Sequence, residues 1–281
     1  MKLDIDAFLQ YLTKQKGYSQ NTVAAYRNDL TQMVAFITAE QARGIITSYD
    51  GLLKSYLLKL KEKRYSVATT ARKVASAKSF FKFMVDSGRM RENPTQNLPS
   101  PQVSRHSLNF LSPSEYQKLL AEPAKLSTPE ARRDVVMLEL LYATGLRISE
   151  LVSLNVKNID LAQNYVHINS KRQVPFDHRL SLILGNFLRS DRLDLLYNEK
   201  EEALFLNRRG TRLTRQGFWQ IIKGYASKAR LGGKVTPQAL RHSFARRKLQ
   251  GGTELRQLQQ LLGHAYISST RVYKEPALRR G

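Results

Sequence analysis

The chain contains no cysteine among its 281 residues, which excludes disulfide bonds, thiol catalysis and thiolate metal sites. It also has no apolar run close to the roughly 18 residues that a membrane-spanning helix needs, so we expect a soluble protein with no membrane role. Its five histidines, at positions 106, 167, 178, 242 and 264, show no metal-ligand spacing. A metal site is therefore not expected.

Acidic residues are half as frequent as basic ones, with 23 against 46 and a net charge of +23. Residues 1–100 hold 16 basic and 8 acidic residues, which leaves 30 and 15 for the rest of the chain. Both parts are thus basic, and the charge is spread over segments with folded character. This favours two modules that grip one nucleic-acid duplex, although a ribosomal or RNA-coating protein would share the same composition.

The N-terminus carries Asp4 and Asp6, where a secretory signal needs a basic start and an apolar core. A cytoplasmic location is therefore expected, and the absence of cysteine fits a reducing compartment.

Residues 1–100 are predicted to form a small bundle of four helices. Ser19 and Ser66 are the predicted N-caps of the second and fourth helices, whose apolar residues recur at helical spacing. The other two helices cover about 5–16 and 49–62.

Four prolines between positions 94 and 113, without clear periodicity, predict an extended linker, which we place at 101–112. The second domain, 113–281, is predicted to be mostly helical with one hairpin at 164–176. The fold class is mainly α: a helical bundle followed by a mixed, mostly helical domain with a small sheet. We expect helices in the second domain at about 113–122, 128–143, 148–154, 178–189, 214–229, 236–249, 253–262 and 268–274.

Two arginines lie at predicted helix boundaries. Gly145 is placed to end one helix, so that Arg147 lies at a fixed corner before the next helix. Thr236 and Pro237 open another helix, and Arg241 lies near its N-terminus, where backbone N–H groups and the helix dipole favour an anion. Each arginine alone would be read as an ordinary surface or structural residue.

A histidine and a tyrosine complete the pattern. Gly263 ends a predicted helix directly before His264, and Tyr273 follows nine residues later. One tyrosine among thirteen is usually a core or surface residue, so the joint pattern carries the hypothesis. Two arginines, a histidine and a tyrosine are the types needed to hold a phosphodiester and attack it with a phenol.

The segments 143–151, 240–242, 261–264 and the terminal Tyr273, in this order and spacing, make the chain similar to the tyrosine recombinases of the phage integrase and Xer group. The similarity extends over nearly the whole chain, and the first domain resembles the family's SAM-like core-binding domain. It implies a site-specific recombinase that cleaves and rejoins double-stranded DNA through a 3′-phosphotyrosyl intermediate, with neither ATP nor any other cofactor.

The resemblance also implies residue roles. Arg147 and Arg241 would bind the non-bridging oxygens of the scissile phosphate, His264 would add a donor, and Tyr273 would be the nucleophile. Glu150 would orient neighbouring groups.

The chain departs from the family at two site positions. Gln238 stands where the family usually has histidine, and glutamine cannot relay a proton near neutral pH. At the hairpin turn, Lys171 and Arg172 compete for the role of protonating the leaving 5′-oxygen. We prefer Lys171, because an arginine stays protonated and is a poor general acid.

Seven further basic residues are predicted to contact the DNA backbone. Reciprocal exchange needs four cuts, so the resemblance implies a homotetramer on two DNA sites and a monomer without DNA. A DNA-binding protein of the same fold with impaired cleavage and a type IB topoisomerase are the alternative functions. The same residues would serve a recombinase in chromosome partition or in integration of a mobile element. The predicted DNA contacts are Arg208, Arg209, Arg212, Arg215, Arg246, Arg247 and Lys248.

Overall fold

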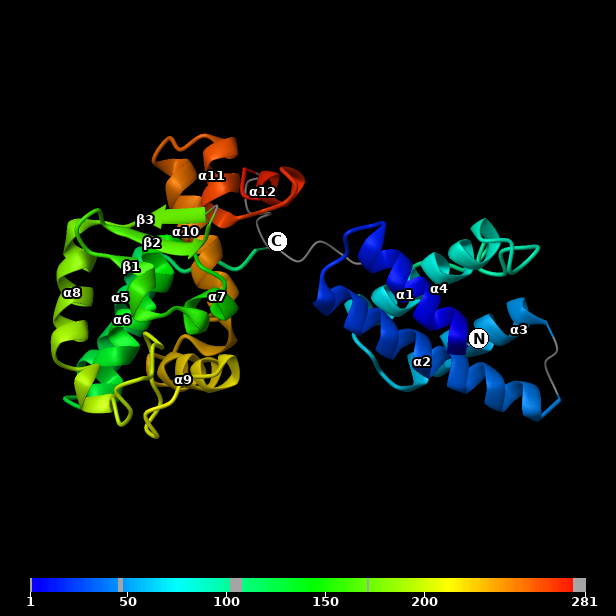
Figure 1. The fold of residues 1–281 in the computed structure, drawn as a ribbon, viewed down its shortest axis with the longest axis horizontal. Helices are drawn as coiled ribbons and strands as arrows, with labels where there is room; N and C mark the ends of the chain where they lie inside the picture. Colours follow the sequence, from blue (N-terminus) through cyan, green and yellow to red (C-terminus); the bar gives the residue numbers. More distant parts are fainter. Residues whose placement is uncertain (1, 45–47, 102–107, 171, 275–281) are drawn as a thin grey trace. The chain divides into compact units, whose positions relative to one another are not determined.

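The computed structural model describes residues 2–44, 48–101, 108–170 and 172–274. These residues are mainly α-helical with one small antiparallel sheet (Figure 1), which confirms the predicted fold class. The chain divides into two compact units, 1–106 and 107–281. Within the described ranges, no helix is long and apolar enough to cross a membrane.

In its described residues, the first unit is a bundle of four helices. Ser19 and Ser66 are the N-caps that the sequence predicts, because each hydroxyl accepts a hydrogen bond from a backbone N–H three residues later. The core includes Phe8 and Phe80, whose rings pack edge to face with centroids 5.6 Å apart. The helices are α1 (Lys2–Lys14), α2 (Gln20–Ala42), α3 (Tyr49–Glu62) and α4 (Val67–Asp86).

A buried ion pair joins α2 to α4 in this unit. Asp29 accepts a 3.0 Å hydrogen bond from the Lys73 ammonium, and both residues are almost fully buried. Arg72 also pairs with Asp29. Because the carboxylate is compensated by two cations, its burial is tolerated.

The second unit is built around α6, which is buried along most of its length. It packs against α5, α8 and α10. Figure 1 shows α10 and α11 at the end of this unit where β3 lies. The helices are α5 (Pro113–Ala124), α6 (Pro129–Thr144), α7 (Ile148–Ser153), α8 (His178–Arg189), α9 (Arg215–Lys228), α10 (Pro237–Gln250), α11 (Leu255–Leu262) and α12 (Ser268–Arg271).

The sheet has the order β1-β2-β3 and is antiparallel throughout. The predicted hairpin is present as β2 (Tyr165–Asn169) and β3 (Arg172–Pro175). The sequence does not predict the remaining strand, β1 (Ile159–Asp160), because two residues are too few for an alternating pattern. The last predicted helix is also shorter than expected, so Tyr273 lies in a turn after α12.

Candidate functional site

The corner between α6 and α7 fixes Arg147. Gly145 ends α6 with a φ of 62°, a left-handed conformation that favours glycine. Arg147 then precedes α7, where its backbone N–H donates to Glu150 Oε2 at 2.7 Å and its Nη1 donates to Oε1 at 2.8 Å. Both contacts hold the exposed arginine against the first turn of α7.

Arg241 links three segments that are distant in sequence. It lies on α10, whose N-cap is Thr236 as predicted, and it is only 7% exposed. Its Nη1 donates to the carbonyl of Gly145 at 2.6 Å, and its Nη2 donates to the carbonyl of Leu262 at 2.6 Å and to His264 Nε2 at 3.0 Å. The same guanidinium therefore contacts the corner after α6 and the end of α11.

His264 follows Gly263, which ends α11 in the left-handed conformation with a φ of 62°. Because arginine can only donate, His264 Nε2 accepts from Arg241, and the ring hydrogen lies on Nδ1. Nδ1 then donates to Thr270 Oγ1 at 2.9 Å. Burial and the nearby Arg241 lower the pKa of His264 to about 4, so the imidazole is neutral at pH 7.

Tyr273 lies against the same cluster. Its ring stacks beside His264 with centroids 6.4 Å apart, and it meets His242 edge to face at 5.6 Å. It also packs against a small apolar cluster that includes Phe244 and Leu262. Burial raises the pKa of the Tyr273 phenol, whereas Arg241 and Arg147 act in the opposite direction.

Glu150 is the carboxylate at the centre of these cations. Its Oε1 accepts from Arg147 and also from Arg172 Nη1, at 2.6 Å. Burial acts to raise the pKa of Glu150, but the hydrogen bond from the Arg147 backbone and the charge of Arg172 outweigh it, so the pKa is lowered. Burial and the neighbouring Arg147 lower the pKa of Arg241 to about 10, which leaves the guanidinium charged at neutral pH.

One predicted site residue lies outside this network. Gln238 is exposed on the first turn of α10, three residues before Arg241 and on the same face of the helix. Lys171 lies outside the described residues. Within the described ranges, no group of three or more His, Cys, Asp or Glu residues could hold a metal ion.

Two of the predicted DNA contacts hold the fold together. Arg212 donates to the carbonyls of Val152 and Leu154, at 3.0 and 2.9 Å. Arg247 donates to the carbonyl of Tyr142 at 2.5 Å, with its guanidinium 3.7 Å from the centre of that ring. Arg246 lies over a phenylalanine ring, and Arg215 and Lys248 lie at the first and last turns of their helices.

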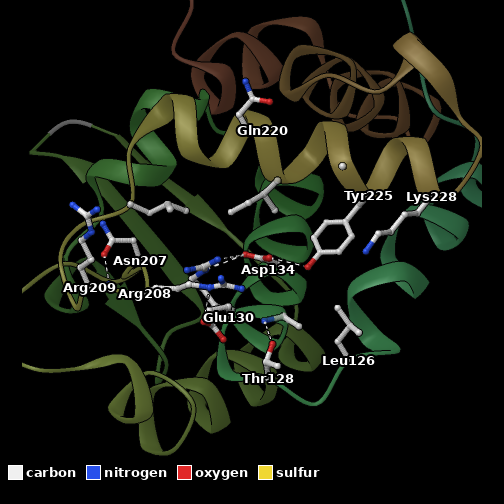
Figure 2. A pocket seen from close by; sticks show the side chains of 15 residues that line it. Leu126, Thr128, Glu130, Asp134, Asn207, Arg208, Arg209, Gln220, Tyr225 and Lys228 are labelled. Atoms are coloured by element: carbon white, nitrogen blue, oxygen red, sulfur yellow. Dashed lines mark hydrogen bonds and ion pairs between the residues drawn. The ribbon is translucent and has the colours of Figure 1, made fainter.

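The remaining two predicted DNA contacts, Arg208 and Arg209, lie at the edge of a pocket of about 630 Å³ between α6 and α9. Figure 2 shows the Tyr225 hydroxyl directed at Asp134, to which it donates at 2.9 Å. Arg208 pairs with Glu130 at 3.0 Å, whereas Arg209 is exposed and lies apart from Asp134 in the same view. The seven basic residues therefore differ in their surroundings.

Sequence reasoning missed three partners in the network. The sequence predicts Arg172 only as a candidate for the leaving group, yet its position in β3 is two residues from buried Val174, and this spacing places both side chains on the inner face. Thr270 and His242 gave no local signal, because their contacts with His264 and Tyr273 depend on how α10, α11 and α12 pack.

Comparison with protein families gives two matches. A model described as the phage integrase family matches residues 109–279, and one described as the phage integrase N-terminal SAM-like domain matches residues 5–88. Among curated relatives, tyrosine recombinase XerC of Herpetosiphon aurantiacus is 45% identical and covers 97% of this chain and 90% of its own. Tyrosine recombinase XerD of Shewanella oneidensis is 37% identical over 98% of this chain and 93% of its own.

Solved structures show the same fold. The crystal structure of XerA recombinase has a TM-score of 0.54 at 26% identity, and it covers 98% of this chain and 94% of that chain. XerH recombinase bound to a palindromic difH substrate has a TM-score of 0.71 at 20% identity, and the match covers 97% of this chain and 91% of the XerH chain. These matches confirm the resemblance drawn from the sequence, and they give no support to the topoisomerase or impaired-cleavage alternatives.

Proposed function

The chain belongs to the phage integrase family and is a tyrosine-type site-specific DNA recombinase, and we propose that it acts by attack of Tyr273 on a phosphodiester bound by Arg147, Arg241 and His264. The observation that carries this proposal is the direct contact of the two arginines with the turn at Gly263 and His264, against which the Tyr273 ring packs.

The first step is transfer of the phosphoryl group from DNA to protein. The Tyr273 oxygen forms a bond to phosphorus, the bond to the 5′-oxygen breaks, and Lys171 protonates that oxygen. The product is a 3′-phosphotyrosyl link and a free 5′-hydroxyl, so a partner strand's hydroxyl can reverse the step without ATP.

The arginines stabilise the charge that develops in this step. A guanidinium donates two parallel hydrogen bonds to a phosphate, and Arg147 and Arg241 together match the non-bridging oxygens. Glu150 supports this role because it orients Arg147 through two hydrogen bonds. A free phenol has a pKa of about 10, so the same cations must stabilise the phenolate, whose proton passes to water because Gln238 cannot accept it.

The assembly follows from the chemistry of exchange. Residues 1–100 would form a DNA clamp, residues 101–112 would form the linker, and residues 113–281 would form the cleaving domain. Four protomers would act together across two DNA sites, and the protein would be a monomer in the absence of DNA. The excess of basic residues in both parts of the chain supports contacts of both domains with DNA. The reaction would take place in the cytoplasm, either in chromosome partition or in integration of a mobile element.

Trapping of the covalent intermediate tests the proposal. The duplex is first selected by binding from a random pool and then nicked near the cleavage position, so that the released strand diffuses away and the adduct accumulates. Wild-type protein should form an adduct, Tyr273→Phe should form none, and Tyr266→Phe should match wild type, because Tyr266 is 74% exposed and outside the network. An adduct in Tyr273→Phe would refute the nucleophile assignment, and its absence in wild type would refute cleavage.

A further inference from the structure

Arg172 contributes a buried guanidinium that the proposed reaction does not use. It is the first residue of β3, and its side chain is 9% exposed. Nη1 donates to Glu150 Oε1 at 2.6 Å, and Nε donates to the carbonyl of Leu261 at 2.9 Å. Its Nη2 is buried and has no hydrogen-bond partner among the described residues. The side chain therefore joins the start of α7 to the end of α11.

Three arginines of the described ranges contact the end of α11, one on each of three successive carbonyls. Leu261 accepts from Arg172, Leu262 accepts from Arg241, and Gly263 accepts from Arg147 at 2.9 Å. The last carbonyls of a helix have no partner within it, and they carry its negative dipole end. Three cations that are distant in sequence are thus held in one arrangement by one helix terminus.

Glycine at position 263 is part of this arrangement. A Cβ built there would lie 3.0 Å from both Cδ and Nη1 of Arg172, and the backbone φ of 62° already disfavours other residues. The arginine side chain therefore lies directly across the turn that carries His264. A displacement of Arg172 would release this turn on the side of β3.

We propose that Arg172 is a positioning residue for strand cleavage, which fixes the end of α11 against Glu150 so that Arg147, Arg241 and His264 are held in one geometry. The inference rests on the proposed function of those three residues. Arg172 acts through other groups, because its contacts are with a carboxylate and a carbonyl of the protein. Its two acceptors lie on different segments, so the fork of an arginine is needed and the single ammonium of a lysine cannot replace it.

The test measures single-turnover cleavage of the nicked duplex by the variants Arg172→Lys and Arg172→Gln. Each variant is present at a concentration that saturates the DNA. Both variants should form the covalent adduct about 100-fold more slowly than wild type, as expected for misplaced reacting groups, with little change in DNA affinity by mobility shift. Arg179→Gln is the matched control, because Arg179 also pairs with a glutamate, Glu139, in the same unit but outside the network. This control should cleave at the wild-type rate.

A second substrate separates positioning from proton donation. A 5′-phosphorothiolate linkage releases a thiolate, which needs no proton because a thiol has a pKa of about 8.5. Lys171→Ala should recover on this substrate, whereas the Arg172 variants should stay slow. Recovery of Arg172→Lys would make Arg172 the leaving-group acid and overturn the positioning role.

Thermal unfolding shows whether each variant is folded. If Arg172→Gln fails to fold, Arg172→Lys decides the question, because it retains a buried cation. A folded Arg172→Lys that cleaves at the wild-type rate would overturn the proposal. Failure of the proposed function is distinguished from this outcome, because it would appear as the absence of an adduct in the wild-type protein.

Discussion

Arg241 donates a hydrogen bond from Nη2 to Nε2 of His264 across 3.0 Å. The histidine is therefore an acceptor in this structure, with its hydrogen on Nδ1 facing Thr270. To donate to a phosphate oxygen from Nε2, the ring must gain a hydrogen there, and its hydrogen bond from Arg241 must be released. Binding of the anion would favour both changes, because negative charge stabilises protonated imidazole.

The low pKa of His264 predicts a pH dependence of stability. The pKa of His264 is about 4 in the folded protein, whereas an ordinary histidine, as in the unfolded chain, has a pKa of 6.5. Between these two pH values the unfolded chain therefore binds more protons than the folded one. Stability contributed by the neutral ring is therefore present above pH 6.5 and is lost as the pH falls toward 4. In His264→Asn, the free energy of unfolding should fall less between about pH 7 and about pH 5 than in wild type.

Urea unfolding at the two pH values measures this difference. His178→Asn is the control for loss of a histidine, because His178 is exposed at the start of α8. An unchanged pH dependence in His264→Asn would show that the ring is not held neutral by its surroundings.

Gly263→Ala should damage cleavage more than stability. A left-handed backbone costs a residue with a Cβ about 1–2 kcal/mol, and the added methyl group would also press on Arg172. The matched control is Gly232→Ala, whose φ of 59° is nearly the same but whose Cβ would meet nothing within 4 Å. Both variants should lose stability in urea unfolding, with the larger loss in Gly263→Ala because Arg172 must shift, and only Gly263→Ala should slow formation of the covalent adduct. Equal cleavage rates would contradict a role for the contact with Arg172.

The helices and their starts could be predicted because their signals are local. Ser19, Ser66 and Thr236 each cap a helix that the sequence places correctly, since a capping hydroxyl bonds to a backbone group only three residues away. Strand β1 could not be predicted, because its two residues are defined by pairing with β2.

The sequence predicts which residues form the candidate site but not how they contact one another. Motif order predicts that Arg147, Arg241 and His264 act together, and the structure joins them directly or through Gly263. The three carbonyls at the end of α11 carry no side-chain signal, so their pairing with three arginines appears only after β3, α7 and α10 have packed around that helix. For the same reason, the sequence could not separate Arg212, which supports the backbone, from exposed Arg209.

Arg209→Ala and Arg212→Ala should therefore have different effects. Arg212→Ala removes the donor to the carbonyl of Val152 and one of the two donors to that of Leu154, and a buried acceptor left without its partner costs about 1–3 kcal/mol. Arg209→Ala should leave the free energy of unfolding unchanged and reduce the salt dependence of DNA affinity by about one phosphate contact. Urea unfolding and binding titrations at several salt concentrations measure both quantities. An unaltered salt slope in Arg209→Ala would remove it from the DNA contacts.

Gln238→His should leave cleavage intact or raise it. Gln238 is exposed on the first turn of α10, on the face that carries Arg241, so a histidine there does not have to enter the core. A neutral imidazole can accept the phenol proton of Tyr273, which a glutamine cannot, and the cleavage rate of the variant should therefore fall below about pH 6.5, where the imidazole becomes charged. Single-turnover cleavage across pH measures this, and Gln220→His at an exposed position of α9 controls for an added histidine. A severe loss of cleavage in Gln238→His, with DNA affinity retained, would show instead that the glutamine amide itself has a specific role.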